Sequence, residues 1–193
     1  MTGTRFRKLT FSIVFALGFA FISGTSQAVT LIFTFSGIAS GSLGGVGFTD
    51  RAYTFSATVD TADRMTVASG FSYNSVTPQA SIAGFGVVTF SGNFRVNINN
   101  NTGGLGIPND DENFDTVSAF NPVFDTYDGL TPIGPVLTNA FITAGAYPIS
   151  TTGGALSFNG AADVPVTVRV IPEPTGVVLL ILGIAGLALR RRR

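Results

Sequence analysis

The alternation that decides the fold is clearest in residues 53–59, which read YTFSATV. Apolar residues occupy the odd positions of this segment, and threonine or serine occupies each even position. Successive side chains of a strand point to opposite faces of a sheet, so one face of the segment is apolar and the other carries hydroxyl groups. The segment therefore predicts a strand of an antiparallel sheet with one buried face and one solvated face.

The same period of two recurs on either side of this segment. It is clear in residues 31–36 (LIFTFS), 94–99 (FRVNIN) and 164–170 (VPVTVRV). Further strand candidates are residues 82–90, 116–124, 136–143 and 155–159. Clusters of Gly, Asn, Asp and Pro separate the runs, at residues 44–45, 60–63, 91–92, 99–104, 128–129, 132–135 and 151–154. Such clusters are typical of turns between strands.

This pattern predicts one all-β domain over residues 29–171. At about 143 residues, the stretch has the length of one ordinary domain. Many short strands joined by Gly- and Asn-rich turns are typical of an antiparallel β-sandwich, and we expect a jelly-roll-like arrangement. A partly closed barrel is the alternative.

Charge is unevenly distributed, although the 11 basic and 11 acidic residues of the chain cancel. Between residues 29 and 171, four arginines stand against ten acidic residues, which gives a net charge of −6 without any lysine. Such a body is a poor partner for nucleic acid, whose phosphates attract basic surfaces. The chain has no Cys and no His. This excludes disulfides, thiol nucleophiles, a Ser-His-Asp triad and the usual zinc sites.

The N-terminus has the three parts of a secretory signal peptide. Arg5, Arg7 and Lys8 form a positive start, and an apolar run follows over residues 9–22. Ser26 and Ala28 are small residues at positions −3 and −1 of a cut after Ala28. We therefore predict a signal peptide over residues 1–28, with an uncut N-terminal membrane helix as the alternative.

The last segment, residues 172–193, begins with Pro172, Glu173 and Pro174. Residues 176–189 are 14 uncharged residues, of which nine are Val, Leu or Ile. The chain then closes with Arg190, Arg191, Arg192 and Arg193. As a helix, the apolar run is about 21 Å long, which is short for a hydrocarbon core of about 30 Å, so we predict a single, marginal transmembrane helix. The arginines resist translocation, so the body lies outside the inner membrane.

The Pro-Glu-Pro tripeptide, the apolar run and the terminal arginine cluster together resemble the PEP-CTERM sorting signal of bacterial, mostly Gram-negative, exported proteins. The resemblance covers residues 172–193, and the predicted signal peptide agrees with it. It implies that an exosortase, a membrane-embedded cysteine protease, acts near the tripeptide. The body would then be released to the cell surface or extracellular matrix.

The prolines agree with this interpretation. Pro172 and Pro174 lack a backbone N–H, so we expect their segment to stay outside any helix or central strand. Pro174 also favours an extended conformation at Glu173. The tripeptide would then be an extended handle that a protease can reach. A linker before a permanent tail anchor is the alternative.

Acidic residues are the first candidates for chemistry in the body. Asp111, Asn113 and Asp115 have the spacing of a calcium loop, but Thr116 and Pro122 stand where an EF-hand needs Gly and Glu. Calcium between the loop of Asp110, Asp111, Glu112 and Asp115 and either Asp125 or Asp128 stays open as a hypothesis. A solvated acidic loop is the interpretation we favour, so we predict neither a resident cofactor nor a metal site.

Catalysis is not predicted either, and no residue is assigned a catalytic role. A glycosidase needs two carboxyl groups about 5 to 9.5 Å apart across a cleft, and ten acids produce some close pair by chance. The glycine-rich residues 36–47 lack the lysine of a phosphate loop, so they predict a flexible loop or weak strands. Sugar binding without catalysis would use aromatic stacking faces, for which the candidates are Tyr53, Tyr73, Tyr127 and Tyr147. A role in the core is the interpretation we favour for these aromatic residues.

Together these features predict an exported, non-enzymatic cell-surface or extracellular-matrix protein. Its expected partners are an exosortase-type protease, extracellular polysaccharide of a biofilm and, transiently, the inner membrane. A secreted carbohydrate-active enzyme or lectin-like module is one alternative. A permanently membrane-anchored periplasmic domain is another.

Overall fold

The computed structural model describes residues 28–142, 147–159 and 164–172 of the chain. Its strands are β1 (Thr30–Leu43), β2 (Val46–Asp60), β3 (Met65–Val67), β4 (Gly70–Val76), β5 (Gln79–Ile82), β6 (Gly86–Thr89), β7 (Phe94–Asn99), β8 (Gly104–Asn109), β9 (Phe114–Phe120), β10 (Ile133–Ile142), β11 (Ile149–Thr151), β12 (Gly154–Phe158) and β13 (Val164–Pro172). Two short 3-10 segments, η1 (Thr61–Asp63) and η2 (Pro122–Thr126), lie in connections. In the described residues, no helix has the length and hydropathy that a bilayer span requires.

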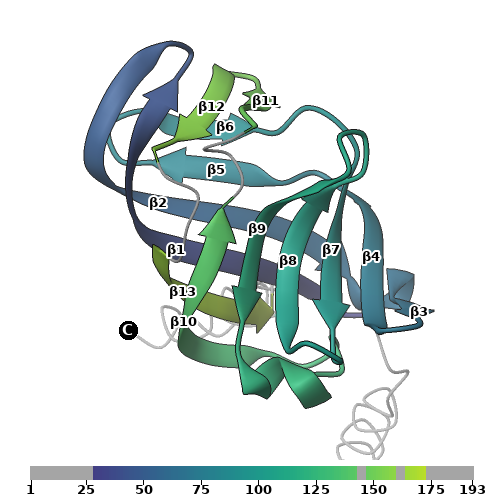
Figure 1. The fold of residues 1–193 in the computed structure, drawn as a ribbon. Coiled ribbons are helices and arrows are strands. Elements are labelled where there is room, and N and C mark those ends of the chain that lie inside the picture. The colour runs from purple at the N-terminus through teal and green to yellow at the C-terminus, as the bar shows by residue number, and fades with distance from the viewer. Residues whose placement is uncertain (1–27, 143–146, 160–163, 173–193) are drawn as a thin grey trace, which may run out of the picture.

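All strand pairs are antiparallel, which confirms the predicted all-β antiparallel body. The strands form one sheet in the order β3-β4-β7-β8-β9-β10-β13-β1-β2-β5-β6, with the β11–β12 hairpin attached to β1 (Figure 1). β4 lies next to the edge strand β3, and β5 lies next to the edge strand β6 at the opposite margin of the sheet. Only Thr77 and Pro78 connect β4 to β5. This short connection draws the two margins together, and the sheet rolls into a nearly closed barrel.

The continuous sheet agrees with the alternative of a partly closed barrel, and the structure does not show the finer, jelly-roll-like arrangement. The physical reason lies in β1, which pairs with β13 through residues 31–36 and with β12 through residues 41–43. Its register with β2 shifts between Ala39 and Gly41. A long strand that bends at such an irregularity belongs to two walls at once, so the sheet stays continuous.

The interior of the barrel is filled by the apolar positions of the alternating segments. Phe55 of β2 is fully buried, and its ring centroid lies 5.2 Å from that of Tyr53 and 5.6 Å from those of Phe90 and Phe158. The ring centroid of Phe33 in β1 lies 6.0 Å from that of Tyr73 in β4, although the two strands are not neighbours in the sheet. Such contacts pack opposite walls against each other, as two layers of a sandwich would be packed.

Several predicted elements differ from the observed ones. Residues 82–90 were expected to form one strand, but they contain only the last residue of β5, a turn with Gly84 and Gly86 at positive φ, and β6. The expected strand 116–124 ends at Phe120, where Asn121 accepts a hydrogen bond from the Val123 N–H and begins η2. Strands β3, β4, β8 and β11 were not predicted. The Gly44–Gly45 turn is confirmed, with both residues at positive φ as a two-residue hairpin turn requires.

Pro172 also departs from expectation. It is the last residue of β13 and pairs with Leu31 of β1, whereas we expected it to lie outside any central strand. The pairing of β13 with β10 reaches only Val170, opposite Ile133. At Pro172 the strand therefore has a neighbour on one side only, and there a missing N–H is tolerated as on an edge strand.

Candidate functional site

The most distinct surface feature is a polar groove on the outer face of β4, β7, β8 and β9. It consists of two adjoining hollows that share Asn97. The larger, about 460 Å³ in volume, lies over β3, β4 and β7, and the smaller, about 70 Å³, lies over β7, β8 and β9. We refer to the two together as the Asn97 groove.

Glycines form the floor of the smaller hollow. Gly106 lies between Asn97 and Ser118 in the sheet, and Gly104 lies between Asn99 and Phe120. A Cβ atom on Gly106 would lie 2.6 Å from the Val117 carbonyl oxygen and 2.8 Å from Ser118 Oγ. Gly104 and Gly106 therefore contribute no side chain to the hollow, whereas Pro108 of the same strand also lines it. The side chains of β7 and β9 stand on either side as walls.

The walls of the smaller hollow present amide, hydroxyl and carboxylate groups. The Asn97 side chain has no hydrogen-bond partner among the residues that the structure describes, so its amide is available to a ligand. Asn99 Oδ1 accepts a bond from the Asn101 N–H at 3.1 Å, which orients its amide. Ser118 Oγ donates to Asp115 Oδ2 at 2.6 Å, so these two groups hold each other in place.

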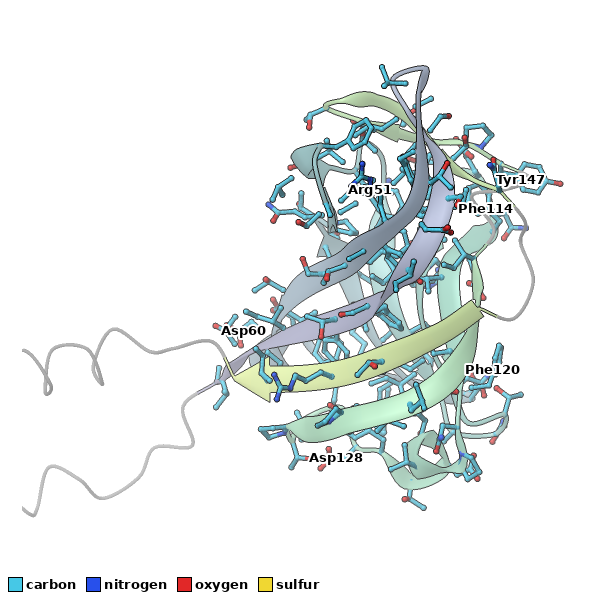
Figure 2. All side chains as sticks on the ribbon, turned by 90° about the vertical axis from the view of Figure 1, so that its left-hand side faces the viewer. Arg51, Asp60, Phe114, Phe120, Asp128 and Tyr147 are labelled. Carbon is cyan, nitrogen blue, oxygen red and sulfur yellow. The ribbon has the colours of Figure 1, made fainter. Side chains whose placement is uncertain are left out.

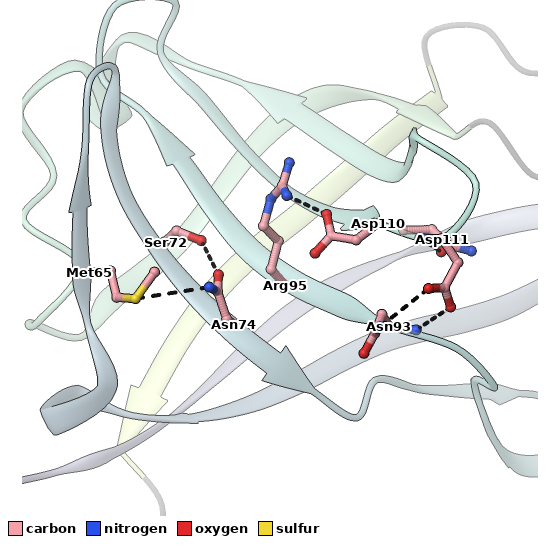
Figure 3. Close-up of polar contacts among 8 residues, drawn as sticks. Met65, Ser72, Asn74, Asn93, Arg95, Asp110 and Asp111 are labelled. Atoms are coloured by element: carbon pink, nitrogen blue, oxygen red, sulfur yellow. Dashed lines mark hydrogen bonds and ion pairs between the residues drawn. The ribbon is translucent and has the colours of Figure 1, made fainter.

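The larger hollow continues this polar surface toward the margin of the sheet. Ser72 Oγ donates to Asn74 Oδ1 at 2.9 Å, and Asn74 Nδ2 lies 3.9 Å from Met65 Sδ. Arg95 extends from β7 and forms an ion pair with Asp110. Figure 3 shows this ion pair between the Ser72–Asn74 contact and the Asn93–Asp111 contact.

The acidic turn between β8 and β9 is tied to the start of β7. Asp111 accepts hydrogen bonds from the Asn93 N–H at 2.8 Å and from Asn93 Nδ2 at 3.3 Å, and the Asp110 N–H donates to the Asn93 carbonyl at 2.9 Å. These contacts fix the turn beside the Asn97 groove. The carboxylates of Asp110 and Asp111 therefore have structural partners within the chain.

Aromatic side chains stand at both ends of β9, and one of them, Phe120, lines the groove. Phe120 is 52% exposed and lines the smaller hollow, where its ring packs over Gly104. At the other end, Tyr147 is 56% exposed and stacks on Phe114 with centroids 5.3 Å apart. Figure 2 shows Phe114, Tyr147 and Phe120 along one side of the molecule. Exposed ring faces beside a polar groove are suited to stacking against a flat apolar surface of a ligand.

Three of the four predicted stacking tyrosines are buried in the core. Tyr53 is buried without a partner for its hydroxyl group among the described residues, and burial raises its pKa. Tyr73 donates to the Gly129 carbonyl, and its pKa is raised to about 12, chiefly by burial. Tyr127 donates to the Thr131 carbonyl at 2.8 Å, and burial raises its pKa too. The interpretation as core aromatics holds for these three, and Tyr147 alone of the four is exposed.

The candidate calcium ligands lie apart in the structure. Residues 110–115 lie at the start of β9, whereas Asp125 and Asp128 follow its end, about 20 Å away along the strand. The described residues hold no group of three acidic side chains that could bind a metal ion. Burial opposes ionisation of Asp128, but hydrogen bonds from Leu130 and Thr131 and the nearby Arg64 outweigh it and lower the pKa of Asp128. A general acid needs a raised pKa instead.

The predicted terminal signals fall almost entirely outside the described residues. Ser26, Glu173 and Pro174 lie outside them, as do the apolar run 176–189 and the cluster of Arg190, Arg191, Arg192 and Arg193. Ala28 is the first described residue and is exposed, and Pro172 ends β13.

Sequence reasoning missed the groove itself. The alternation in residues 94–99 predicted a solvated face at Asn97 and Asn99, but it gave no sign that this face is hollowed. A signal was available in residues 104–107, which read GLGI and alternate glycine with aliphatic side chains. A strand with this pattern buries one face and leaves the other face bare.

The groove is chemically suited to an uncharged ligand that is rich in hydroxyl groups. Its amides and hydroxyls both donate and accept hydrogen bonds, and a few well-placed polar groups fix the orientation of a ligand. No protein-family model, curated protein or solved structure matches the chain.

Proposed function

We propose that this chain is an exported, non-enzymatic protein of the cell surface or extracellular matrix, whose β-barrel body binds extracellular polysaccharide. The signal peptide (residues 1–28) directs export. The PEP-CTERM-like segment then holds the chain transiently in the inner membrane through residues 176–189 and the arginines that follow. An exosortase-type protease cuts near Pro172, Glu173 and Pro174 and releases the body.

The position of the chain ends supports this proposal. Leu31, three residues after the proposed signal cut, pairs with Pro172 in the sheet. The start of β1 and the end of β13 therefore lie side by side at one pole of the barrel, the pole near Asp60 (Figure 2). A body joined to both signals at a single pole leaves the rest of its surface free for binding.

The Asn97 groove is the observation that carries the binding role. It combines the available Asn97 amide, two glycines in its floor and an exposed aromatic ring, a combination that suits sugar hydroxyls and the apolar face of a sugar ring. The aspartates beside it are engaged by protein groups: Asp110 by Arg95, Asp111 by Asn93 and Asp115 by Ser118. This favours binding over the alternative of a carbohydrate-active enzyme.

Intact-mass measurement on fractionated cells tests export and processing. We expect a released species that begins at Val29 and lacks the four terminal arginines. Replacing Arg190 to Arg193 with serine should reduce the amount held at the membrane, because the basic stop signal is lost. Only full-length chains in the membrane fraction, in a host with an active exosortase, would instead support the permanently anchored alternative.

Affinity electrophoresis in gels that contain an uncharged glucan tests the binding role. We expect the purified body, residues 29–172, to be retarded, and Asn97→Ala to abolish most of the retardation. Thr58→Ala, on the outer face of β2, is the matched control and should migrate as the parent does. Release of reducing ends from the glucan would contradict the non-enzymatic assignment.

A further inference from the structure

The charges around the Asn97 groove are arranged unevenly. Arg95 is the one basic residue among those lining the two hollows. Its guanidinium forms an ion pair with Asp110, and both side chains remain partly exposed, at 41% and 35%. The Asp110 carboxylate accepts from Arg95 Nη1 and therefore competes with an acidic ligand for the guanidinium. The cation of the groove is therefore neutralised from within the chain.

The remaining ionised groups near the groove are negative. Asp115 lines the smaller hollow, and Asp111 lies in the same turn as Asp110 beside the larger one. The body as a whole adds to this field, since residues 29–171 of the sequence carry a net charge of −6. A polysaccharide with uronic acid groups would bring its carboxylates toward these aspartates, and like charges at short range in a partly desolvated site repel each other.

The uncharged side chains of the groove do not repel neutral sugars. Asn97 and Asn74 line the larger hollow, and their side-chain amides carry donors and acceptors that complement sugar hydroxyls. Phe120 at the end of the smaller hollow is indifferent to charge on the ligand but favours an apolar ring face.

We propose that the Asn97 groove selects uncharged polysaccharide and rejects polyuronates, and that the Arg95–Asp110 ion pair determines this specificity. This inference rests on the polysaccharide binding proposed above and names the ligand class of that site. Asp110 acts as a specificity-determining residue: it occupies Arg95 and leaves the groove with amides, hydroxyls and net negative charge.

The test compares the binding of a neutral glucan and a polyuronate of matched length to the purified body. The parent body should bind the neutral glucan at least about ten-fold more tightly. Asp110→Asn frees Arg95 for a charge-assisted bond to a uronate, so the affinity for the polyuronate should rise about ten-fold while the affinity for the glucan changes less than about two-fold. Raising the salt concentration should abolish the gain.

Asp128→Asn is the matched control, because it removes one negative charge at the opposite end of β9. It should leave both affinities within about two-fold of the parent, whereas a general effect of net charge would make the two variants alike. Equal changes in the two variants, or equal binding of both polysaccharides by the parent body, would overturn the specificity inference alone. Binding of neither polysaccharide would overturn the proposed function as well.

Discussion

Single residues shape the Asn97 groove by what they lack. Gly106 has no side chain between Asn97 and Ser118, and an added Cβ would lie 2.8 Å from Ser118 Oγ. Asp128, at the other end of β9, shows the opposite case, in which one short side chain organises a whole turn. Each case leads to a measurable consequence.

Gly106→Ala should destabilise the fold. The added Cβ would lie 2.6 Å from the Val117 carbonyl, and a backbone atom cannot move aside cheaply. We expect a loss of about 1–3 kcal/mol in the free energy of unfolding, measured by urea denaturation. Gly134→Ala in β10 is the control, because its Cβ would meet nothing within 4 Å, and it should change the free energy by less than about 0.5 kcal/mol. Similar losses in both variants would contradict the crowded floor.

Asp128 should contribute to stability in a pH-dependent way. Its Oδ1 accepts from the Leu130 N–H at 2.8 Å and from the Thr131 N–H at 3.2 Å. Although burial opposes ionisation, these bonds and Arg64 hold the pKa below the ordinary value of 3.8. A depressed folded-state pKa means that the stabilisation is present above the ordinary value and is lost as the pH falls through the folded value.

Asp128→Asn keeps an oxygen acceptor but cannot titrate, so it isolates this effect. Between about pH 6 and pH 3, we expect the parent body to lose more stability in urea titrations than the variant does. The other carboxylates contribute to both proteins alike and cancel in the comparison. Parallel pH profiles would show that Asp128 is not coupled to folding.

At the scale of the element, β1 and β2 connect the walls of the barrel. β1 pairs with three strands, β2, β12 and β13. The buried residues of β2 supply much of the aromatic core. The solvent-exposed side of β9 differs from β2, because its Phe120 lines the groove and does not pack in the core. The same residue type should therefore respond differently to truncation in the two elements.

Phe55→Ala and Phe120→Ala make that comparison. Phe55 is fully buried among three aromatic rings, so its truncation should cost about 3–5 kcal/mol of unfolding free energy. Phe120 is 52% exposed, so its truncation should cost less than about 1 kcal/mol but should weaken the retardation by glucan. Urea denaturation and affinity electrophoresis on both variants check this. A large loss of stability in Phe120→Ala would place that ring in the core instead.

At the scale of the whole molecule, the roll of the sheet brings the two chain ends together. Leu31 and Pro172 are register partners in neighbouring strands, so only a short bridge separates the start of β1 from the end of β13. The β5–β6 turn lies elsewhere on the surface, and Gly84 within it faces open space, since a Cβ atom added there would meet no other atom within 4 Å.

A circular permutant tests this arrangement. Residues 29 and 172 are joined by a Gly/Ser linker of about two to five residues, and new ends are opened between Ala83 and Gly84. We expect the permutant to fold with the near-ultraviolet circular dichroism of the parent body. A linear body that lacks residues 171 and 172 is the companion measurement and should be less stable, because it loses the pairs of Ile32 and Leu31 with β13. A permutant that does not fold would contradict the adjacency of the ends.

Much of the sheet follows from local pattern. The alternation of residues 53–59 and 94–99 predicts strands and their buried faces, because a period of two admits one burial pattern at a given register. The turn at Gly44 and Gly45 is equally local, since both residues adopt positive φ. Strands β4 and β8 escaped prediction because their patterns are broken: Ser75 adopts positive φ beside a register shift in β4, and Pro108 sits at a shift in β8.

Composition and periodicity were sufficient to predict the all-β class and to exclude disulfides and His or Cys chemistry. They also led to the expectation of signals at both ends. All of these depend only on residue types and their spacing. The closure of the sheet, the depth of the Asn97 groove and the pairing of Arg95 with Asp110 depended on tertiary structure. Each requires residues far apart in the chain to meet. Strand order and register decide that meeting, and they result from the packing of the whole core rather than from any local segment.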